Sequence, residues 1–430
     1  MKIFVVGGGG REHALVWKLC QSPLASSIYC APGNPGIGGE TLRDGTPVRC
    51  VPIKATELEA LVAYAKREMP DLTVVGPDDP LALGLVDALQ TAGLPVWGPT
   101  QRAARFESSK TFAQDFMQRH GIPSPEAAAF SDPRDAIAFA EHLRWSCAIK
   151  ADGLALGKGV LLCRSESEAK YAIGHILEER AFGGAGERIV IQELLEGPEI
   201  SMHAFCDGTT LKVFPTSQDH KRAFDGNSGP NTGGMGAYSP APLLGGHELK
   251  SIEREVFDRW MRGCEAEGIR FCGLLYPGLV LTKDGPKVIE FNARFGDPEA
   301  QVYLPRLESD LVELLCASVE GRLSKIDLRW SDEAVVCVVM ASAGYPGTYD
   351  DGKPIRGLAA AASMPDVKVF HSGTRSANDG VVTSGGRVLA VTARAGTLED
   401  AVLRAYAAVD AIEFEGAHYR RDIAAGASVR

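Results

Sequence analysis

The amino-acid sequence predicts an α/β protein that begins with a doubly wound parallel sheet. Apolar runs of strand length alternate with amphipathic helical stretches through the first hundred residues, and this alternation is typical of a parallel sheet with helices on both faces. The chain is also long. Because its 430 residues exceed what one compact core accommodates, we expect roughly two to four domains.

The strands and helices of the first domain follow from the apolar pattern. We expect strands over residues 3–6, 27–30, 72–75 and 94–97, and helices over residues 12–20 and 56–68. Ligands of such sheets bind outside the carboxyl ends of the strands, where loops rich in glycine and proline lie at residues 7–10, 31–36 and 76–81. The first loop misses the dinucleotide fingerprint, because Glu12 stands where its third glycine belongs. It could still hold one phosphate group of a smaller ligand.

A glycine-rich hairpin is expected over residues 148–162. Apolar runs flank its glycines, and Lys150 and Lys158 supply positive charge, so the stretch could cover phosphate groups. It is not a Walker A loop, because Lys158 is followed by Gly159 rather than by serine or threonine. A solvated hairpin tip is the alternative interpretation. Helices expected to begin near residues 133 and 166 make residues 126–191 a small α+β lobe around this hairpin.

A helix before this lobe carries a lysine in an unusual place. Ser109 can cap the helix, and Lys110 follows in its first turn, where the helix dipole disfavours a cation. This position hints at a role facing a ligand, although an exposed lysine is the commoner explanation.

Residues 287–294 predict a strand with one chemically active face. Alternation places Ile289 and Phe291 toward the core and Glu290, Asn292 and Arg294 on the opposite face. A carboxylate and an amide oxygen two residues apart suit Mg²⁺, which keeps nucleotide phosphates as further ligands. A half-buried sheet with a polar outer face is the alternative. The polar, glycine-rich loop over residues 226–238 is expected to be either functional or disordered.

Composition narrows the class of protein. The chain has 45 basic and 55 acidic residues, for a net charge of −10, which argues against a nucleic acid or an anionic membrane as the main partner. No apolar run reaches the roughly 20 residues of a membrane helix, and the amino terminus does not form a signal peptide, so we expect a cytoplasmic protein. The ten cysteines contain no C-x-x-C pair and are expected to be reduced and mostly buried. The last hundred residues predict strands over 335–340, 367–370 and 388–392 and a helix over 397–408, with no catalytic set.

Taken together, these motifs resemble the phosphoribosylamine–glycine ligase family, the glycinamide ribonucleotide synthetases of purine biosynthesis, within the ATP-grasp superfamily. The resemblance runs nearly end to end. It is carried by residues 9–14, 31–34, 109–110, 149–155, 157–160, 217–222, 229–240, 289–292 and 294–299.

The resemblance implies four structural parts and one reaction. The parts are an amino-terminal substrate-binding domain over residues 1–103, a central ATP-grasp domain over 104–125 and 192–328, a mobile lid over 126–191, and a small carboxy-terminal α+β domain over 329–430. The reaction is the ATP-dependent ligation of glycine to 5-phosphoribosylamine, giving glycinamide ribonucleotide, ADP and phosphate through glycyl phosphate. Such phosphoryl transfer needs positioning and charge neutralisation rather than a protein nucleophile.

The same resemblance implies residue roles. ATP is expected against Lys110, Lys150, Gly157, Lys158, Gly159, Glu193 and Glu199. Mg²⁺ or Mn²⁺ is expected on Glu290 and Asn292, and the catalytic residues are expected to be Arg294 and Asp297. Substrate contacts are expected from Gly9, Gly10, Asn34, Asp78, Asp219, Gly296, Pro298 and Glu299. The implied partners are these small molecules, and we expect a monomer, with a weak dimer as the alternative.

The sequence departs from the family pattern at two informative positions. Asp78 stands where the family usually has glutamate, so it is expected to reach its ligand through water, and Leu156 replaces a small alanine, which is expected to change the packing of the lid.

Two other functions compete with the ligase interpretation. A biotin carboxylase-like enzyme would share the lid and the metal strand but not the loop over residues 229–240. A non-catalytic nucleotide sensor would need neither the paired metal ligands nor an amino-terminal substrate domain.

Overall fold

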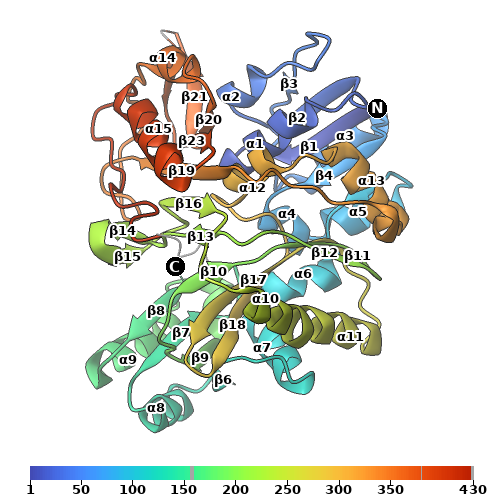
Figure 1. Cartoon of the computed structure of the whole chain (residues 1–430). Coiled ribbons are helices and arrows are strands. Elements are labelled where there is room, and N and C mark those ends of the chain that lie inside the picture. The colour runs from blue at the N-terminus through green and yellow to red at the C-terminus, as the bar shows by residue number, and fades with distance from the viewer. Residues whose placement is uncertain (155–158, 379, 428–430) are drawn as a thin grey trace.

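The computed structural model describes residues 1–154, 159–378 and 380–427. Its amino-terminal part is a five-stranded sheet in the order β3-β2-β1-β4-β5, and every pair in it is parallel (Figure 1). The strands are β1 (Lys2–Gly7), β2 (Ser27–Pro32), β3 (Arg49–Cys50), β4 (Leu72–Val75) and β5 (Val96–Trp97). The predicted parallel sheet is confirmed. The sequence did not predict β3, because only two exposed residues form it.

Helices cover both faces of this sheet, as predicted. Val5 faces a core that includes Leu15 of α1, whereas Val6 faces a second core with Leu61 and Leu85; this alternation is the signature of a strand buried on both sides. The helices of this part are α1 (Gly10–Leu19), α2 (Pro35–Gly38), α3 (Leu58–Glu68), α4 (Asp78–Ala82) and α5 (Leu85–Thr91).

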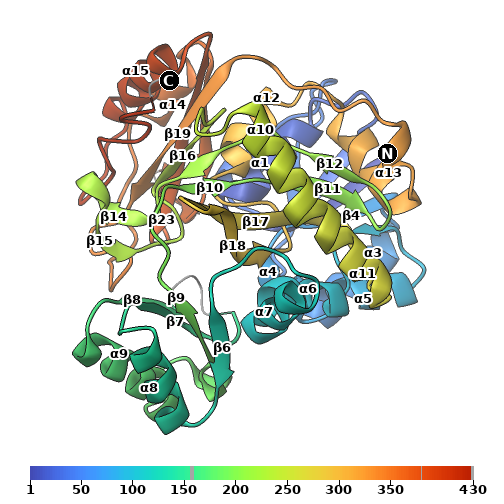
Figure 2. The ribbon, with the colours of Figure 1, turned by 60° about the horizontal axis from the view of Figure 1, so that its bottom comes forward.

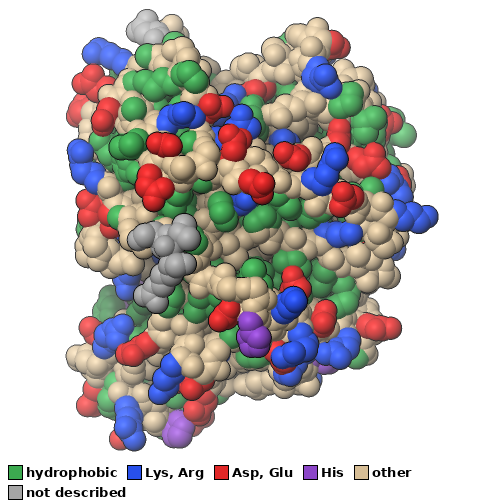
Figure 3. All heavy atoms as spheres, in the orientation of Figure 1, with side chains coloured by type: hydrophobic (Ala, Val, Ile, Leu, Met, Phe, Trp, Pro, Cys, Tyr) green, Lys and Arg blue, Asp and Glu red, His purple; other side chains and the backbone are tan. Residues whose placement is uncertain are grey.

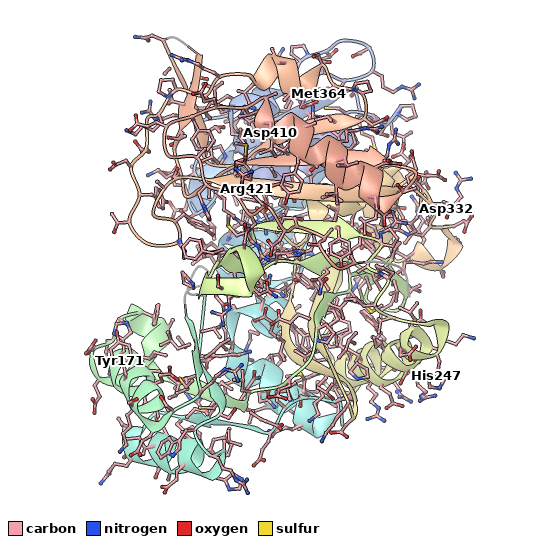
Figure 4. All side chains as sticks on the ribbon, turned by 60° about the vertical axis from the view of Figure 1, so that its left-hand side comes forward. Tyr171, His247, Asp332, Met364, Asp410 and Arg421 are labelled. Atoms are coloured by element: carbon pink, nitrogen blue, oxygen red, sulfur yellow. The ribbon has the colours of Figure 1, made fainter. Side chains whose placement is uncertain are left out.

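A four-stranded antiparallel sheet forms a lobe that projects from the rest of the molecule (Figure 2). Its strand order is β6-β9-β7-β8, with β6 (Ala127–Phe130), β7 (Cys147–Ala151), β8 (Val160–Cys163) and β9 (Ile189–Glu193). The helices α8 (Pro133–His142) and α9 (Glu166–Ile173) pack on it, and Tyr171 of α9 lies on the outer side of the lobe (Figure 4). The hairpin expected over residues 148–162 is confirmed as β7 and β8. The expected lid boundary at residue 191 falls inside β9, which pairs with β6 and β7.

The central sheet is built around the long strand β17. It contains β10 (Glu199–Ser201), β11 (Ala204–Asp207), β12 (Leu211–Val213), β17 (Cys272–Thr282) and β18 (Gly285–Asn292), and its helices are α6 (Gln101–Ser108), α7 (Lys110–Arg119), α10 (Gly246–Ile252) and α11 (Arg259–Ala266). As predicted, Ser109 caps α7, because its side chain accepts from the Phe112 N–H at 3.2 Å.

The prediction that Ile289 faces the core is wrong. The pairing of β17 with β18 shifts between Gly278 and Leu279, so that Gly278 pairs with Glu290 and Leu279 with Val288. Such a bulge leaves one extra residue on β18 and breaks strict alternation. Val288 and Phe291 therefore enter the core, while Ile289 lines the cleft described below.

The carboxy-terminal sheet draws strands from two distant segments. Its order is β13-β16-β19-β23-β20, in which β13 (Gln218–Asp219) and β16 (Gly236–Ser239) join β19 (Ala334–Ala341), β20 (Val367–His371) and β23 (Arg387–Ala395). The other α-helices are α12 (Ala300–Arg306), α13 (Leu311–Glu320), α14 (Leu358–Ala362) and α15 (Leu398–Asp410). Two-stranded pairs are formed by β14 (Arg222–Phe224) with β15 (Ser228–Asn231) and by β21 (Thr374–Ala377) with β22 (Gly380–Thr383). The predicted strands and the final helix are confirmed, and the loop over residues 226–238 is partly strand.

Surface charge, the burial of the cysteines and the lengths of the helices can be compared with the predictions made from composition. Acidic and basic side chains are interspersed on the face shown in Figure 3. Seven of the ten cysteines are buried, as the prediction of mostly buried thiols requires. Over the described residues, no helix is both long and apolar enough to cross a membrane.

Candidate functional site

A cleft of about 420 Å³ lies where the four parts of the molecule meet. Each part contributes charged or polar residues to its wall: Arg11 from α1 and Asp78 from α4, Lys110 from α7, Lys150 and Glu193 from the lobe of β6 to β9, Glu290, Asn292 and Arg294 from β18 and its end, and Arg387 from β23. Part of the lining is apolar instead and includes Leu194, Leu195, Val280 and Ile289. Such a cleft suits a ligand with a flat apolar part and several negative charges.

Lys110 and Lys150 connect the lobe of β6 to β9 with the central part of the molecule. Lys150 is buried, and its ammonium donates to the Ile289 carbonyl at 2.9 Å. Burial lowers the pKa of Lys150, although Glu290 opposes that shift. Lys110 donates to the Gly153 carbonyl at 2.8 Å, and the neighbouring Thr111 N–H donates to Asp152 at 3.2 Å. The start of α7 is thereby tied to the end of β7.

Glu290 and Asn292 present oxygen atoms to the same cleft. Burial disfavours the charge on Glu290, but Lys150, Lys221 and Lys110 outweigh it and hold the pKa of that carboxyl below its usual range. Within the described part of the chain, the carboxylate takes no hydrogen bond. The Asn292 Oδ1 accepts a long hydrogen bond from Arg294, at 3.4 Å. A carboxylate and an amide oxygen placed in this way fit a hard divalent cation that keeps phosphates as its other ligands.

Arg294 is held by a glutamate that the sequence analysis missed. The Arg294 guanidinium lies 2.7 Å from Glu107, whose second oxygen accepts from the Ala293 N–H at 2.8 Å. Burial opposes the charge of Arg294, but Glu107 and Asp78 outweigh it and raise the pKa of the guanidinium. No sequence motif marks Glu107, because it ends α6, far from β18 along the chain.

The turn after β18 rests on a buried polar network. The Gly296 N–H donates to His203 Nε2 at 3.2 Å, and Glu299 accepts from Tyr276 at 2.5 Å and from Ser201 at 3.0 Å. Burial would raise the pKa of Glu299, but Lys221 and the other partners bring it down to about 2. Glu299 therefore supports the turn from below.

The Glu299 network predicts a loss of stability in acid. Because its folded pKa of about 2 lies below the ordinary glutamate value of 4.5, its contribution to the free energy of unfolding is complete above pH ~4.5 and is lost as the pH falls toward 2. A shift of this size corresponds to about 3 kcal/mol. Urea unfolding at pH values from 7 down to 3 measures this loss, and the free energy of unfolding of Glu299→Gln should decline less over this range than that of the unsubstituted chain. Glu59 lies on the exposed side of α3, so the free energy of unfolding of Glu59→Gln should decline as it does in the unsubstituted chain. Equal declines in all three proteins would contradict the assignment.

The structure brings most of the sequence-predicted residues to the cleft. Among the lining residues are Asp78, Lys110, Lys150, Gly159, Glu193, Glu199, Glu290, Asn292, Arg294 and Asp297. Gly157 and Lys158 lie outside the described residues, as does Leu156, for which altered packing of the lid was predicted.

The other predicted residues lie beside or behind the cleft. Asn34 caps α2 by accepting from the Ile37 N–H and donates to the carbonyls of Gly8 and His371. Gly9 and Gly10 face Asp297, and Asp219 pairs with Lys221 at 2.5 Å. Gly296, Pro298 and Glu299 form the turn and its support. Substrate contact by these residues stays a prediction.

Four charged residues of the cleft wall were not among the predicted site residues: Arg11, Glu107, Lys221 and Arg387. Lys221 lies in the stretch over residues 217–222, from which the sequence analysis chose Asp219 as a substrate contact. The spacing of residues in this stretch could not show that the Lys221 side chain lines the cleft. Arg387 comes from the carboxy-terminal sheet, where no catalytic set was expected.

A second hollow, of about 630 Å³, lies between Phe224, Tyr345 and His418. Its described lining residues include no aspartate, glutamate, lysine or arginine. Despite its larger volume it offers no means to neutralise phosphate, so we do not assign the chemistry to it.

Comparison with known protein families finds three matches in chain order. Residues 1–107, 108–300 and 335–426 match the models described as the N domain, the ATP-grasp (A) domain and the C domain of phosphoribosylglycinamide synthetase. A phosphoribosylamine–glycine ligase from Chlorobaculum tepidum is 48% identical over 428 residues, which cover 99% of this chain and 100% of that protein.

Two solved structures place the fold. The crystal structure of a phosphoribosylamine–glycine ligase from Thermotoga maritima superposes with a TM-score of 0.82 at 30% identity and covers 98% of this chain and 100% of that one. The biotin carboxylase domain of a 2-oxoglutarate carboxylase from Hydrogenobacter thermophilus, in complex with MgADP and bicarbonate, gives a TM-score of 0.72 at 14% identity over 97% of this chain and 91% of that one. The second likeness shows a shared fold alone.

Proposed function

The chain belongs to the phosphoribosylglycinamide synthetase family, and we propose from this membership how its cleft performs the reaction. It is an ATP-dependent ligase of purine biosynthesis that joins glycine to phosphoribosylamine. The observation that carries the proposal is that Lys110 and Lys150 line the same cleft as Glu290 and Asn292 and act on the charge of Glu290. Cations beside oxygen ligands in one cleft are what a nucleotide with a divalent metal requires.

ATP is proposed to lie between the lobe of β6 to β9 and the central sheet. Lys110 and Lys150 would neutralise its phosphates, and the backbone of Gly157, Lys158 and Gly159 would cover them. The adenine would sit against the apolar side near Leu194, Leu195 and Ile289, with Glu193 and Glu199 at its edge and at the ribose. Closure of the lobe as a lid would keep water from the reactive intermediate.

Glu290 and Asn292 are the residues that would hold Mg²⁺ or Mn²⁺. The Glu290 carboxylate takes no hydrogen bond within the described residues, the Asn292 Oδ1 accepts a long one from Arg294, and the surrounding lysines keep Glu290 ionised. The metal would supply charge stabilisation at the phosphate oxygens.

The chemical steps are proposed to follow from the charges around Arg294 and Asp297. A glycine carboxylate oxygen attacks the γ-phosphorus of ATP, the bond to the β,γ-bridging oxygen breaks, and ADP leaves, giving glycyl phosphate. The amine of 5-phosphoribosylamine then attacks the glycyl carbonyl carbon, phosphate leaves with the former carboxylate oxygen, and the amine loses a proton. Arg294 would bind the carboxylate and then the acyl phosphate, while Asp297 and the turn over residues 296–299 would lie beside the glycine.

The remaining parts of the proposal concern organisation. The amino-terminal residues Gly9, Gly10, Asn34 and Asp78 would hold the phosphoribosylamine, and Asp219 would lie near the substrates. We propose that the chain divides into four parts, over residues 1–103, 104–125 with 192–328, 126–191 and 329–430. We also propose that the protein is a monomer, with a weak dimer as the alternative. Its proposed location is cytoplasmic, as expected for purine biosynthesis.

One assay separates this function from its alternatives. ADP release from ATP should require glycine and phosphoribosylamine together, and omission of either should reduce the rate to background. Turnover driven by bicarbonate would favour the carboxylase-like function. ATP binding without turnover would favour a nucleotide sensor.

A further inference from the structure

We propose that Arg387 is a positioning residue for the ligation. It holds the carboxylate of Asp297 and the backbone of Gly233 in place beside each other at the cleft. The inference rests on the proposed place of Asp297 beside the glycine substrate. It assigns a role in the reaction to the carboxy-terminal sheet.

Arg387 joins two segments that are distant in sequence. Its Nη1 donates to the Gly233 carbonyl at 2.7 Å and to the Asp297 carbonyl at 2.7 Å, while its Nη2 lies 3.3 Å from Asp297 Oδ2. A Cβ built on Gly233 would lie 3.0 Å from the guanidinium carbon, so a side chain at this position would force the guanidinium to shift. Tyr345 adds a second clamp, because its hydroxyl accepts from the Gly233 N–H at 3.0 Å.

The contacts leave the Asp297 carboxylate little freedom. Its Oδ1 accepts from Gln301 at 2.7 Å, and its Oδ2 faces Arg387. A Cβ on Gly9 or Gly10 would lie 3.8 or 3.6 Å from these oxygens, so the first glycine loop lies directly against the carboxylate. Arg387 thereby sets the orientation of Asp297 where the amino-terminal, central and carboxy-terminal parts meet.

The charges around Asp297 define its ionisation. Burial disfavours its charge, and Glu299 adds to that effect, but Arg387 and Arg11 outweigh both and hold the pKa of Asp297 below its usual range. Loss of the Arg387 cation should therefore raise the pKa of Asp297.

Only an arginine fits this role. A guanidinium presents several donors in one plane and can serve two carbonyls and a carboxylate at once, whereas a lysine ammonium is a flexible point charge. Lysine at position 387 should therefore keep the charge and lose the geometry. Arg394 lies on the same strand, β23, but pairs with Glu333 and Asp366 at the surface, and it serves as a matched control.

The test compares Arg387→Ala, Arg387→Lys and Arg394→Ala in the full chain, with ADP formation measured against glycine and ATP concentration and against pH. Arg387→Ala should lower kcat/KM for glycine roughly 10- to 100-fold, the size typical of misplaced reacting groups, while KM for ATP changes less than about threefold. The acidic limb of its pH profile should move to higher pH, and added guanidinium should restore part of the rate. Arg387→Lys should show a reduced rate without the shift in pH. Arg394→Ala should behave as the unsubstituted enzyme.

The inference would be overturned if Arg387→Ala matched Arg394→Ala in kcat/KM for glycine, or if Arg387→Lys kept full activity. It would also be overturned if Arg387→Ala lowered kcat/KM for ATP and for glycine equally and left the pH profile unchanged. If Arg387→Ala does not fold, as judged by its thermal melting, Arg387→Lys carries the test alone. The unsubstituted enzyme is assayed first. Its failure to require glycine and phosphoribosylamine would overturn the proposed function, whereas normal turnover with unaffected variants would overturn only the role of Arg387.

Discussion

Replacing Glu290 by alanine is expected to lower the rate of ADP formation by roughly 1,000-fold, or about 4 kcal/mol. The substitution removes the carboxylate of the Glu290–Asn292 pair, on which Lys150, Lys221 and Lys110 all act. The γ-phosphoryl group would then transfer without the charge stabilisation that a bound divalent cation supplies. The rate is measured in single turnover with both substrates present, and Mn²⁺ binding in the presence of an unreactive ATP analogue is followed by electron paramagnetic resonance.

A control on the same hairpin separates loss of charge from loss of structure. Asp284 is exposed at the turn between β17 and β18, so Asp284→Asn should keep the full rate and bind Mn²⁺ normally. Near-normal ADP formation by Glu290→Ala, or unchanged Mn²⁺ binding, would contradict the metal assignment.

Replacing Lys150 by methionine is expected to reduce kcat/KM for ATP by roughly 100-fold, which corresponds to about 3 kcal/mol and to the loss of charge-assisted hydrogen bonds. Methionine keeps the apolar stem of the buried side chain and removes its ammonium group. Because Lys150 is the strongest of the cations that lower the pKa of Glu290, the variant should also need higher pH for metal binding. Initial rates against ATP concentration at several pH values measure both effects.

Lys170→Met is the matched control for this prediction. Lys170 lies on α9 of the same lobe, is exposed and pairs with Glu166, so its loss should leave KM for ATP unchanged, as expected for a surface pair. If Lys150→Met retains the ATP dependence of Lys170→Met, Lys150 does not contact the nucleotide.

The elements built from local patterns were predictable from the sequence. The alternation of strands and helices in the first domain, the hairpin of β7 and β8, and the cap at Ser109 all depend on residues close together in the chain. Glu290 and Asn292 could be predicted to lie together for the same reason, because they share one strand, and both line the cleft.

The features that were missed depend on long-range contacts. The bulge that turns Ile289 into the cleft is set by the pairing of β18 with β17, and no alternation rule reports it. Glu107 acquires its role only because α6 meets the end of β18. Arg387 reaches the cleft because β23 lies in a sheet with strands from residues 218–239. Dividing the chain into consecutive domains does not predict that a residue of the carboxy-terminal part lines this cleft.

The most direct test of the proposed chemistry follows the oxygen atoms of glycine. If the carboxylate attacks the γ-phosphorus of ATP and the amine then displaces phosphate, glycine labelled with ¹⁸O in its carboxylate should transfer one labelled oxygen to each phosphate released. Mass spectrometry of the phosphate measures this transfer, with unlabelled glycine in ¹⁸O-water as the complementary experiment. Phosphate that carries one glycine oxygen and none from water is the predicted result. Phosphate that takes its oxygen from water would contradict the account.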